Sequence, residues 1–228
     1  MLSIIIPTYN EKKNIQIISK KLLKIKIVSE IIFVDDSSID KTFLEIKKLK
    51  NKKIKGYLRK KNRDLSKSVI FGITKAYNKI ILVMDCDLQH DVRYIPIMWN
   101  KFKKSDCDLV IASRFKKRSF LGNLGLLRSF ISNTAIFMIN FVFGKITSDP
   151  LSGFFMCKRE LVLKNKKYFF AKGYKILFDI LFNSQKNLIV LDHKIEFKKR
   201  SYEKSKFKFA IIWLFLRQMI YTKFLVKK

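Results

Sequence analysis

Several features that mark common protein classes are missing from this sequence. Its three cysteines, Cys86, Cys107 and Cys157, show no Cys-x-x-Cys spacing, so no disulfide framework is indicated and a reducing cytoplasm fits. No Gly-x-Gly-x-x-Gly follows the first apolar run, and Gly-Lys-Ser/Thr does not occur. Dinucleotide-binding and P-loop sites are therefore unsupported.

Long apolar runs are also missing. No stretch reaches about 18 clean apolar residues, so no membrane-spanning helix is predicted. No basic region precedes the first apolar run, which ends at Pro7, and we expect no signal peptide. Phenylalanine is unevenly spread instead: of 21, only Phe33, Phe43 and Phe71 precede residue 100. The second half is therefore expected to meet an apolar partner.

Acidic residues are scarce relative to basic ones. The chain has 18 Asp and Glu against 49 Lys and Arg, a formal charge of +31, while 48% of its residues are hydrophobic. The chain is thus long and apolar enough for a core, and its charge predicts phosphorylated substrates, an anionic membrane or nucleic acid as partners. Alternatively, the lysines only solvate the surface. Charge alone supports nucleic acid, without an RNA-binding signature or zinc knuckle, so no nucleic acid partner is expected.

Apolar runs of strand and helix type alternate along the first half. Strands are predicted at 2–6, 30–34, 54–58, 79–84, 108–112, 151–158 and 188–197, and helices at 11–26, 41–49, 66–77, 120–143, 175–184 and 209–226. This alternation is typical of the α/β class with a doubly wound, mostly parallel sheet flanked by helices. Without a repeat or linker, residues 1–228 are expected to form a single domain.

Polar side chains follow three of the predicted strands. Asp85, Asp87 and Gln89 come after the fourth, and in an extended chain they would share one face, which suits Mg²⁺ or Mn²⁺. Asp35 and Asp36 follow the second strand, and Pro7-Thr-Tyr-Asn-Glu11 follows the first. Each acidic group has a plainer interpretation, since Asp is common in turns and also caps helices. However, the carboxyl ends of parallel strands meet at one edge, where such sheets bind ligands, so together they predict a site.

The ordered motifs carry a resemblance to a known family. They are Pro7-Thr-Tyr-Asn-Glu11, Val34-Asp-Asp-Ser-Ser38 with Asp40 and Thr42, Asp85-Cys-Asp-Leu-Gln-His90, Val110-Ile-Ala-Ser-Arg114, Asp149-Pro-Leu-Ser-Gly-Phe-Phe155, Gly173-Tyr-Lys175 and Arg200 to Lys206. In this order they resemble the inverting, GT-A type glycosyltransferases of family 2, above all the dolichol-phosphate (polyprenyl-phosphate) mannosyltransferases. The departures affect loops: Asp64, Ala112 and Glu203 replace glycines, and Asp91-Val92 replaces Pro-Pro.

The resemblance implies roles for individual residues. Residues 1–115 would bind the nucleotide sugar, and residues 116–228 would form the acceptor and membrane-interface half. The implied donor-binding residues are Pro7, Tyr9, Glu11, Val34, Asp35, Asp36, Asp85, Cys86 and Lys175. The implied metal ligands are Asp85, Asp87 and Gln89, the catalytic residues Asp87 and Arg114, and the acceptor-phosphate residues Arg114, Arg128, Ser132, Arg200 and Lys206.

The implied reaction transfers mannose from GDP-mannose to a polyprenyl phosphate with a divalent metal, Mg²⁺ or Mn²⁺. A lipid phosphate is already ionised at neutral pH, which explains why no general base stands out. The Phe-rich helices predicted at 120–143 and 209–226 would lie in the membrane interface, which makes the protein peripheral on the cytoplasmic face of an anionic membrane. Alternatively, these helices only pack on the sheet.

Three other functions stay open. One is transfer of glucose, N-acetylglucosamine or aminoarabinose from a UDP-sugar-type donor to undecaprenyl phosphate. Another is transfer to a glycan, which would need a carboxylate to deprotonate a hydroxyl. The third, of a different class, is a non-catalytic basic protein that binds anionic membrane or RNA.

Overall fold

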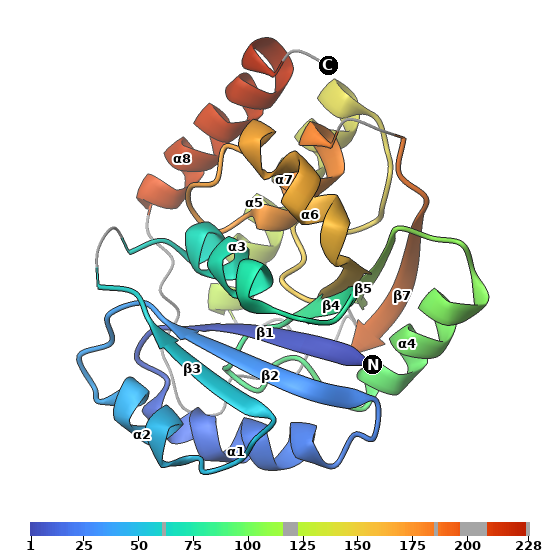
Figure 1. The fold of residues 1–228 in the computed structure, drawn as a ribbon. Coiled ribbons are helices and arrows are strands. Elements are labelled where there is room, and N and C mark those ends of the chain that lie inside the picture. The colour runs from blue at the N-terminus through green and yellow to red at the C-terminus, as the bar shows by residue number, and fades with distance from the viewer. Residues whose placement is uncertain (61–62, 116–122, 185–186, 197–208, 227–228) are drawn as a thin grey trace.

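A computed structural model of the chain describes residues 1–60, 63–115, 123–184, 187–196 and 209–226 (Figure 1). The strands are β1 (Leu2–Thr8), β2 (Val28–Asp35), β3 (Ile54–Leu58), β4 (Ile80–Val83), β5 (Leu109–Phe115), β6 (Phe155–Lys158) and β7 (Val190–Glu196). The helices are α1 (Lys12–Leu23), α2 (Thr42–Lys48), α3 (Leu65–Lys75), α4 (Tyr94–Lys104), α5 (Asn123–Phe143), α6 (Arg159–Asn165), η2 (Lys166–Tyr168), α7 (Ile176–Asn183), α8 (Phe209–Ile220) and the π-helical turn η3 (Tyr221–Leu225).

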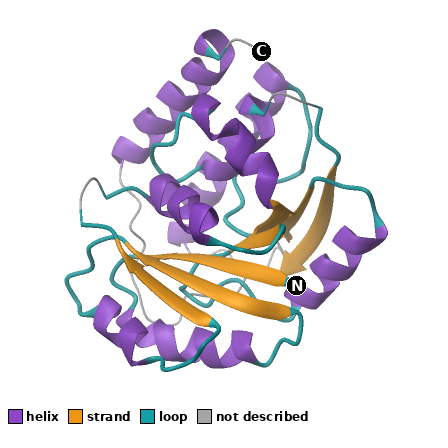
Figure 2. Cartoon of the chain, in the orientation of Figure 1, coloured by secondary structure: helices purple, strands orange, loops and turns teal. Residues whose placement is uncertain are grey.

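The seven strands form one sheet in the order β3-β2-β1-β4-β6-β5-β7 (Figure 2). The first four strands in the chain pair in parallel, and β5 pairs in parallel with β7. Only β6 runs against its neighbours, β4 and β5. The predicted α/β fold with a mostly parallel sheet is thus confirmed, with one antiparallel strand inserted between the two parallel groups.

Two apolar layers sandwich the sheet, because successive strand residues point to opposite faces. Ile4 and Ile6 pack toward α1, α2 and α4, where Met98 is fully buried. Ile5 packs toward α3 and the helices α5 to α7, where Phe178 is fully buried. Figure 1 shows α1 and α2 on one side of the strands and α3, α6 and α7 on the other.

The carboxyl ends of β1, β2, β3 and β4 meet at one edge of the sheet, because these strands are parallel. The register pairs Pro7 with Val34 and Thr8 with Asp35, and it continues from Asp35 to Leu58 at the end of β3. Loops that follow these strands therefore lie side by side. This edge carries the polar motifs of the first half.

The helices predicted at 120–143, 175–184 and 209–226 are present as α5, α7 and α8 with η3, but α6 and η2 were not predicted. The strand predicted at 151–158 is shorter in the structure, because β6 begins only at Phe155. The C-terminal part of α5 is amphipathic: Ile139 is buried, whereas Phe141 is 83% exposed. Lys223 of η3 donates to the Val142 carbonyl at 3.3 Å, which holds η3 beside the end of α5. Of the helices in the described ranges, none is long and apolar enough to cross a bilayer.

Candidate active site

A tight acidic turn follows β4. The strand ends at Val83, and Leu88 has the left-handed φ of 64°, which an extended strand does not allow. The prediction that Asp85, Asp87 and Gln89 alternate along an extended chain is therefore wrong. They are placed by a turn instead, in which the Gln89 backbone N–H donates to Asp87 Oδ1 at 3.1 Å. Asp87 is only 3% exposed.

His90 holds this turn closed. Its Nδ1 accepts the backbone N–H of Asp85 at 3.0 Å, so a neutral ring carries its proton on Nε2. Nε2 lies 3.9 Å from Asp85 Oδ2. The buried imidazole also stacks on Phe154, with 4.9 Å between ring centroids. His90 thus fixes the backbone direction of the acidic turn.

The loop before β6 connects this turn to the C-terminal half. A Cβ placed on Gly153 would lie 3.1 Å from Asp85 Oδ2, so glycine lets the loop approach the carboxylate. Ser152 Oγ donates to the Ala112 carbonyl at 2.8 Å, which anchors the loop to β5. Lys175 Nζ lies 3.5 Å from the Leu151 carbonyl. The loop therefore borders both Asp85 and Lys175.

Arg114, at the end of β5, pairs with Asp149 of the same loop. Nε donates to Asp149 Oδ2 at 2.6 Å and a terminal nitrogen to Oδ1 at 2.8 Å, a bidentate pair. Burial lowers the pKa of Arg114, but the bonds and charge of Asp149, with the charge of Asp85, raise it above its ordinary value. One edge of the Arg114 guanidinium is thus bound to Asp149. The positive charge of Arg114 also lies close enough to Asp85 for the two to interact.

Asp35, at the end of β2, is buried in a polar cluster. Its carboxylate accepts Thr8 Oγ1 at 3.3 Å and the Ser38 backbone N–H at 3.3 Å, and the Ser38 hydroxyl also donates to it. Burial raises the pKa of Asp35, and these hydrogen bonds act against that rise. Ser38 Oγ in turn accepts the Asn10 N–H at 2.8 Å. Asp35 therefore joins the loop after β1 to the loop after β2.

The same two loops meet again at the start of α1 and α2. The Glu11 N–H donates to Thr42 Oγ1 at 2.9 Å, and the Lys12 N–H donates to Asp40 Oδ2 at 3.1 Å. Asp40 also accepts the Thr42 N–H at 3.0 Å, but the N-cap position of α2 is occupied by Lys41, not by Asp40. Asn14 donates to Glu11 Oε2 at 2.7 Å. Glu11 is thereby held in a fixed, buried position at this edge.

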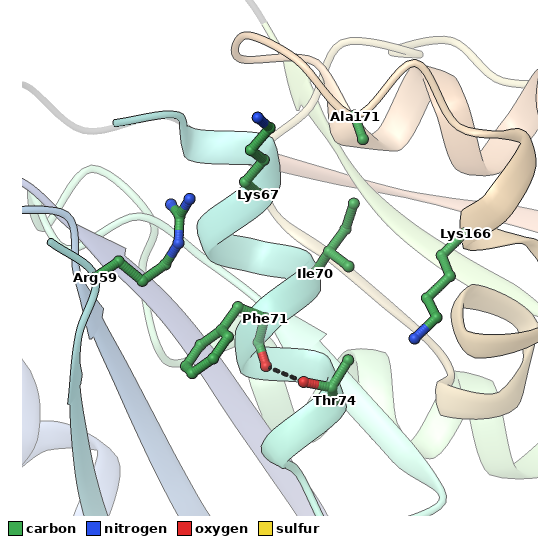
Figure 3. Close-up of a pocket in the computed structure, with 7 residues that line it drawn as sticks. All are labelled: Arg59, Lys67, Ile70, Phe71, Thr74, Lys166 and Ala171. Atoms are coloured by element: carbon green, nitrogen blue, oxygen red, sulfur yellow. Dashed lines mark hydrogen bonds between the residues drawn. The ribbon is translucent and has the colours of Figure 1, made fainter. Parts of the chain in front are cut away.

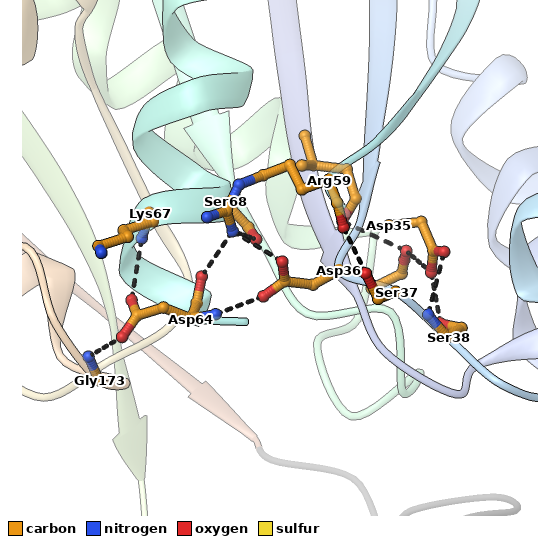
Figure 4. Close-up of polar contacts among 11 residues, drawn as sticks. Asp35, Asp36, Ser37, Ser38, Arg59, Asp64, Lys67, Ser68 and Gly173 are labelled. Carbon is orange, nitrogen blue, oxygen red and sulfur yellow. Dashed lines mark hydrogen bonds and ion pairs between the residues drawn. The ribbon is translucent and has the colours of Figure 1, made fainter. Parts of the chain in front are cut away.

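Asp36 occupies the next position and has different partners (Figure 4). One oxygen accepts an Arg59 N–H at 2.8 Å, and the other accepts the Asp64 backbone N–H at 2.5 Å. The same Arg59 nitrogen lies 2.7 Å from Ser68 Oγ. Arg59 was not predicted as a site residue. It directly follows β3, and this position at the end of a parallel strand is the signal by which the sequence could have indicated it.

Tyr9 contributes a partly exposed aromatic ring to this edge. The Arg63 guanidinium carbon lies 4.2 Å from the ring centroid, a cation–π contact. Pro7 and Val34 are buried strand residues, and Val34 packs toward Gly72 of α3, where an added Cβ would lie 3.1 Å from its methyl group. Both side chains are part of the buried layer at this edge. Their contact with a nucleoside stays a prediction.

A pocket of 380 Å³ lies along α3, and Arg59 is one of the residues that line it (Figure 3). Lys67, Ile70 and Phe71 of α3 form one wall, and Lys166 of η2 faces them. Neither Asp85 nor Asp87 lines this space. We therefore place the candidate site at the acidic strand ends, where the polar groups converge, and not in this pocket.

The predicted site residues fall into three groups. Those that the fold brings to the strand edge or its bordering loops are Pro7, Tyr9, Glu11, Val34, Asp35, Asp36, Asp85, the buried Cys86, Asp87, Gln89, Arg114 and Lys175. Arg128 and Ser132 belong to α5, and their side chains are not described. Arg200 and Lys206 lie outside the described residues. The roles of all these residues stay predictions.

The acidic turn offers the donor types that a hard divalent cation prefers. Two carboxylates and an amide oxygen are present, and Gly153 keeps the space beside Asp85 free of a side chain. Within the described ranges, no three His, Cys, Asp or Glu side chains gather as a metal-holding cluster. The residues therefore fit a cation that takes only part of its ligands from the protein and the remainder from phosphate oxygens or water.

The mixed sheet with this acidic edge is a GT-A-like fold. Glucosyl-3-phosphoglycerate synthase from Mycobacterium tuberculosis, in a crystal structure with Mn²⁺, UDP and glucosyl-3-phosphoglycerate, has a similar fold. The TM-score is 0.72 at 16% identity, over 97% of this chain and 78% of that one. The same enzyme with phosphoglyceric acid gives the same TM-score and coverage.

The family model "Glycosyl transferase family 2" matches residues 3–165, and the chain belongs to that family. Two dolichol-phosphate mannosyltransferases are similar in sequence. The one from Pyrococcus furiosus is 33% identical over 223 residues, which is 96% of this chain and 62% of that protein. The one from Saccharomyces cerevisiae is 30% identical over 188 residues, or 78% of this chain and 69% of that protein. The chain thus spans less than two thirds of the Pyrococcus relative.

Proposed function

We propose that this protein transfers mannose from GDP-mannose to a polyprenyl phosphate of the dolichyl type, with inversion and with a divalent metal. The two mannosyltransferase relatives support this substrate class. The observation that carries the proposal is the meeting of the acidic turn with Arg114 and Lys175 around the loop of Asp149 to Gly153. A reaction between two phosphate-bearing substrates needs carboxylates that can hold a metal and cations that can neutralise phosphate, and both border this loop.

On the donor side, the nucleoside diphosphate would lie along the ends of β1, β2 and β4. Asp85, Asp87 and Gln89 would hold Mg²⁺ or Mn²⁺, which when bound neutralises the negative charge that develops on the leaving diphosphate. Asp35 and Asp36 are already fixed by their hydrogen bonds, so the donor would meet a preformed edge. Such preorganisation lowers the cost of binding.

On the acceptor side, the lipid phosphate is the nucleophile. One of its oxygens forms a bond to the anomeric carbon as the bond from that carbon to the diphosphate breaks. Since the phosphate is ionised at neutral pH, no side chain has to remove a proton, and positioning with charge neutralisation carries the rate. In the described ranges Arg114 is the cation proposed for this phosphate, and Arg128, Ser132, Arg200 and Lys206 would complete the set. Lys175, proposed for the donor, lies at the same loop.

The lipid would be reached from the membrane surface. Four large aromatic side chains of α5, α8 and η3 are unusually exposed: Phe137 at 70%, Phe141 at 83%, Trp213 at 66% and Phe224 at 75%. We call these four residues the C-terminal aromatic surface. Exposed aromatic residues on amphipathic helices are suited to the interface of a bilayer, and the net charge of +31 favours anionic lipids. We propose peripheral attachment at the cytoplasmic face.

The test is transfer of labelled mannose from GDP-mannose to a polyprenyl phosphate in detergent, with Mn²⁺ or Mg²⁺ and with EDTA. We expect metal-dependent formation of a mannosyl phosphate lipid. UDP-glucose and UDP-N-acetylglucosamine serve as competing donors in the same assay. Transfer from a UDP-sugar alone would overturn the choice of donor, and no transfer from any nucleotide sugar would overturn the enzymatic proposal.

A further inference from the structure

The segment Phe170–Lys175, between η2 and α7, has an unusual backbone. Ala171 and Gly173 both have left-handed φ values, 51° and 86°. Leu214 of α8 packs so closely on Gly173 that an added Cβ would lie 2.8 Å from its methyl group. The backbone N–H groups of such a segment have no partners within a helix or strand, so they need other acceptors.

Two carboxylates from different parts of the fold supply these acceptors. Asp179 of α7 accepts the Ala171 N–H at 2.9 Å, and Asp64, at the start of α3, accepts the Gly173 N–H at 2.5 Å. Ser66 donates both its N–H and its hydroxyl to the Gly173 carbonyl, each at 3.0 Å. Hydrogen bonds from amides to ionised carboxylates are strong, so the segment is clamped from both sides.

Asp64 also faces the donor edge. Its backbone N–H donates to Asp36 at 2.5 Å, and its carbonyl accepts from Arg59 at 3.1 Å. Figure 4 shows Asp64 between Asp36 on one side and Gly173 on the other. A continuous path of hydrogen bonds thus leads from the end of β2 to the residues just before Lys175.

The other end of the segment reaches the acidic turn. Lys175 Nζ lies 3.5 Å from the Leu151 carbonyl, and Gly153, two residues on, lies against the Asp85 carboxylate. The Lys175 carbonyl accepts from the buried amide of Gln218 at 3.2 Å, which fixes its backbone as well. The position of the lysine amine beside the site therefore depends on the position of this segment.

A simpler role for Asp64 is to cap α3. Its Oδ1 does accept the Lys67 N–H at 3.1 Å, as an N-cap residue should. The cap uses one oxygen, however, and the other goes to Gly173, which is 109 positions away in the chain. The two roles make different predictions, because a cap stabilises α3 and a clamp orders the segment before Lys175.

We propose that Asp64 and Asp179 are positioning residues that clamp Phe170–Lys175 and thereby place the Lys175 amine beside the acidic turn, where it meets a substrate phosphate. The second part rests on the proposed function. Neither carboxylate touches substrate in this account, and both act through Lys175.

The variant Asp64→Asn tests the clamp, because asparagine is as good an N-cap as aspartate but brings no charge and only one acceptor oxygen. Hydrogen exchange of the Phe170–Lys175 amides, measured on the intact protein without substrate, should accelerate by about tenfold or more. The control Asp108→Asn removes another buried carboxylate, which binds the Ile189 N–H at the opposite edge of the sheet. That control should leave exchange in the segment unchanged.

A double-mutant cycle with Lys175→Met tests the link to transfer. Asp64→Asn should lower kcat/KM about tenfold in the native background and less than about twofold in the Lys175→Met background, because coupled residues are not additive. Unchanged exchange of the segment in Asp64→Asn would overturn the clamp. Equal losses in both backgrounds would overturn its action through Lys175. Absence of transfer from any donor would instead overturn the proposed function, and the exchange experiment would still decide the clamp.

Discussion

The first half of the site and its C-terminal half are built in opposite ways. At the ends of β1 and β2, Asp35, Asp36 and Glu11 are buried and each is held by hydrogen bonds from neighbouring loops. Toward the C-terminus, the aromatic rings of Phe141 and Phe224 are instead left largely exposed on helices. Fixed polar groups suit a small charged ligand, whereas exposed rings suit a fluid lipid surface. The difference is what the proposed function, with one half for each substrate, would require.

The largest effect should come from Asp87. The variant Asp87→Asn keeps the size of the side chain and can still accept the Gln89 N–H, but removes its charge from the acidic turn. We expect kcat to fall by about a hundredfold to a thousandfold, the scale for losing one group that stabilises developing charge. Steady-state transfer of labelled mannose measures it, with Asp108→Asn as the matched control. Near-native activity of Asp87→Asn would remove this residue from the metal site.

The pair that joins the two halves should come next. Asp149→Asn leaves Arg114 without its bidentate partner. Because Asp149 is buried but the Arg114 side chain is 28% exposed, the loss should be about 1 to 3 kcal/mol, less than for a fully buried pair. Denaturant unfolding should show this loss, and transfer should fall as well because Arg114 can leave its position. Arg114→Lys provides the comparison, since lysine keeps the charge without the fork. If neither variant changes stability or transfer, the pair does not join the halves.

Asp179, in the second half of the chain, should make the free energy of unfolding depend on pH. Burial raises its pKa from 3.8 to about 6, against the hydrogen bonds from Gln218 and Ala171. An acid whose pKa is raised on folding favours the folded state when protonated, so its contribution falls as pH rises from about 4 to 6, by about 2 to 3 kcal/mol in total. Unfolding free energies at pH 4.5 and 7 should therefore differ in this sense, and Asp179→Asn should remove that part. The same pH dependence in the variant would contradict the assignment.

The smallest effect should concern only the C-terminal aromatic surface. Phe137→Ser and Phe141→Ser should each weaken binding to vesicles that contain anionic lipid by about tenfold, since each ring loses apolar burial. Vesicle sedimentation measures this, and transfer to a short-chain acceptor in detergent should stay unchanged. Leu44→Ser, at a half-exposed position of α2, is the control. Equal losses in the control would show that the surface has no special part in membrane binding.

The strands and the site edge could be predicted from the sequence because their signals are local. Apolar runs such as 54–58 match their strands, and polar residues at parallel strand ends must meet at one edge. No helix was predicted at 94–104, where the structure has α4 with Pro96 inside it. In α4 it occupies the first turn, where a missing N–H costs nothing.

Contacts between distant segments could not be predicted. The bond between Asp64 and Gly173 spans 109 positions, and the pair of Arg114 with Asp149 spans 35. Nothing local in either sequence segment specifies its partner. The turn at Asp85 to Gln89 was misjudged for a related reason. His90, whose Nδ1 accepts the Asp85 N–H, stacks on Phe154 of the loop before β6, which is 64 positions away in the chain.

Binding of GDP with Mn²⁺, measured by calorimetry, tests most directly the claim that the acidic edge binds the donor through a metal. The wild-type protein should bind GDP with Mn²⁺ and much more weakly with EDTA, Asp87→Asn should lose this metal dependence, and Phe137→Ser should bind as the wild type does. Equal GDP affinity in the wild type and Asp87→Asn, with and without Mn²⁺, would contradict the account.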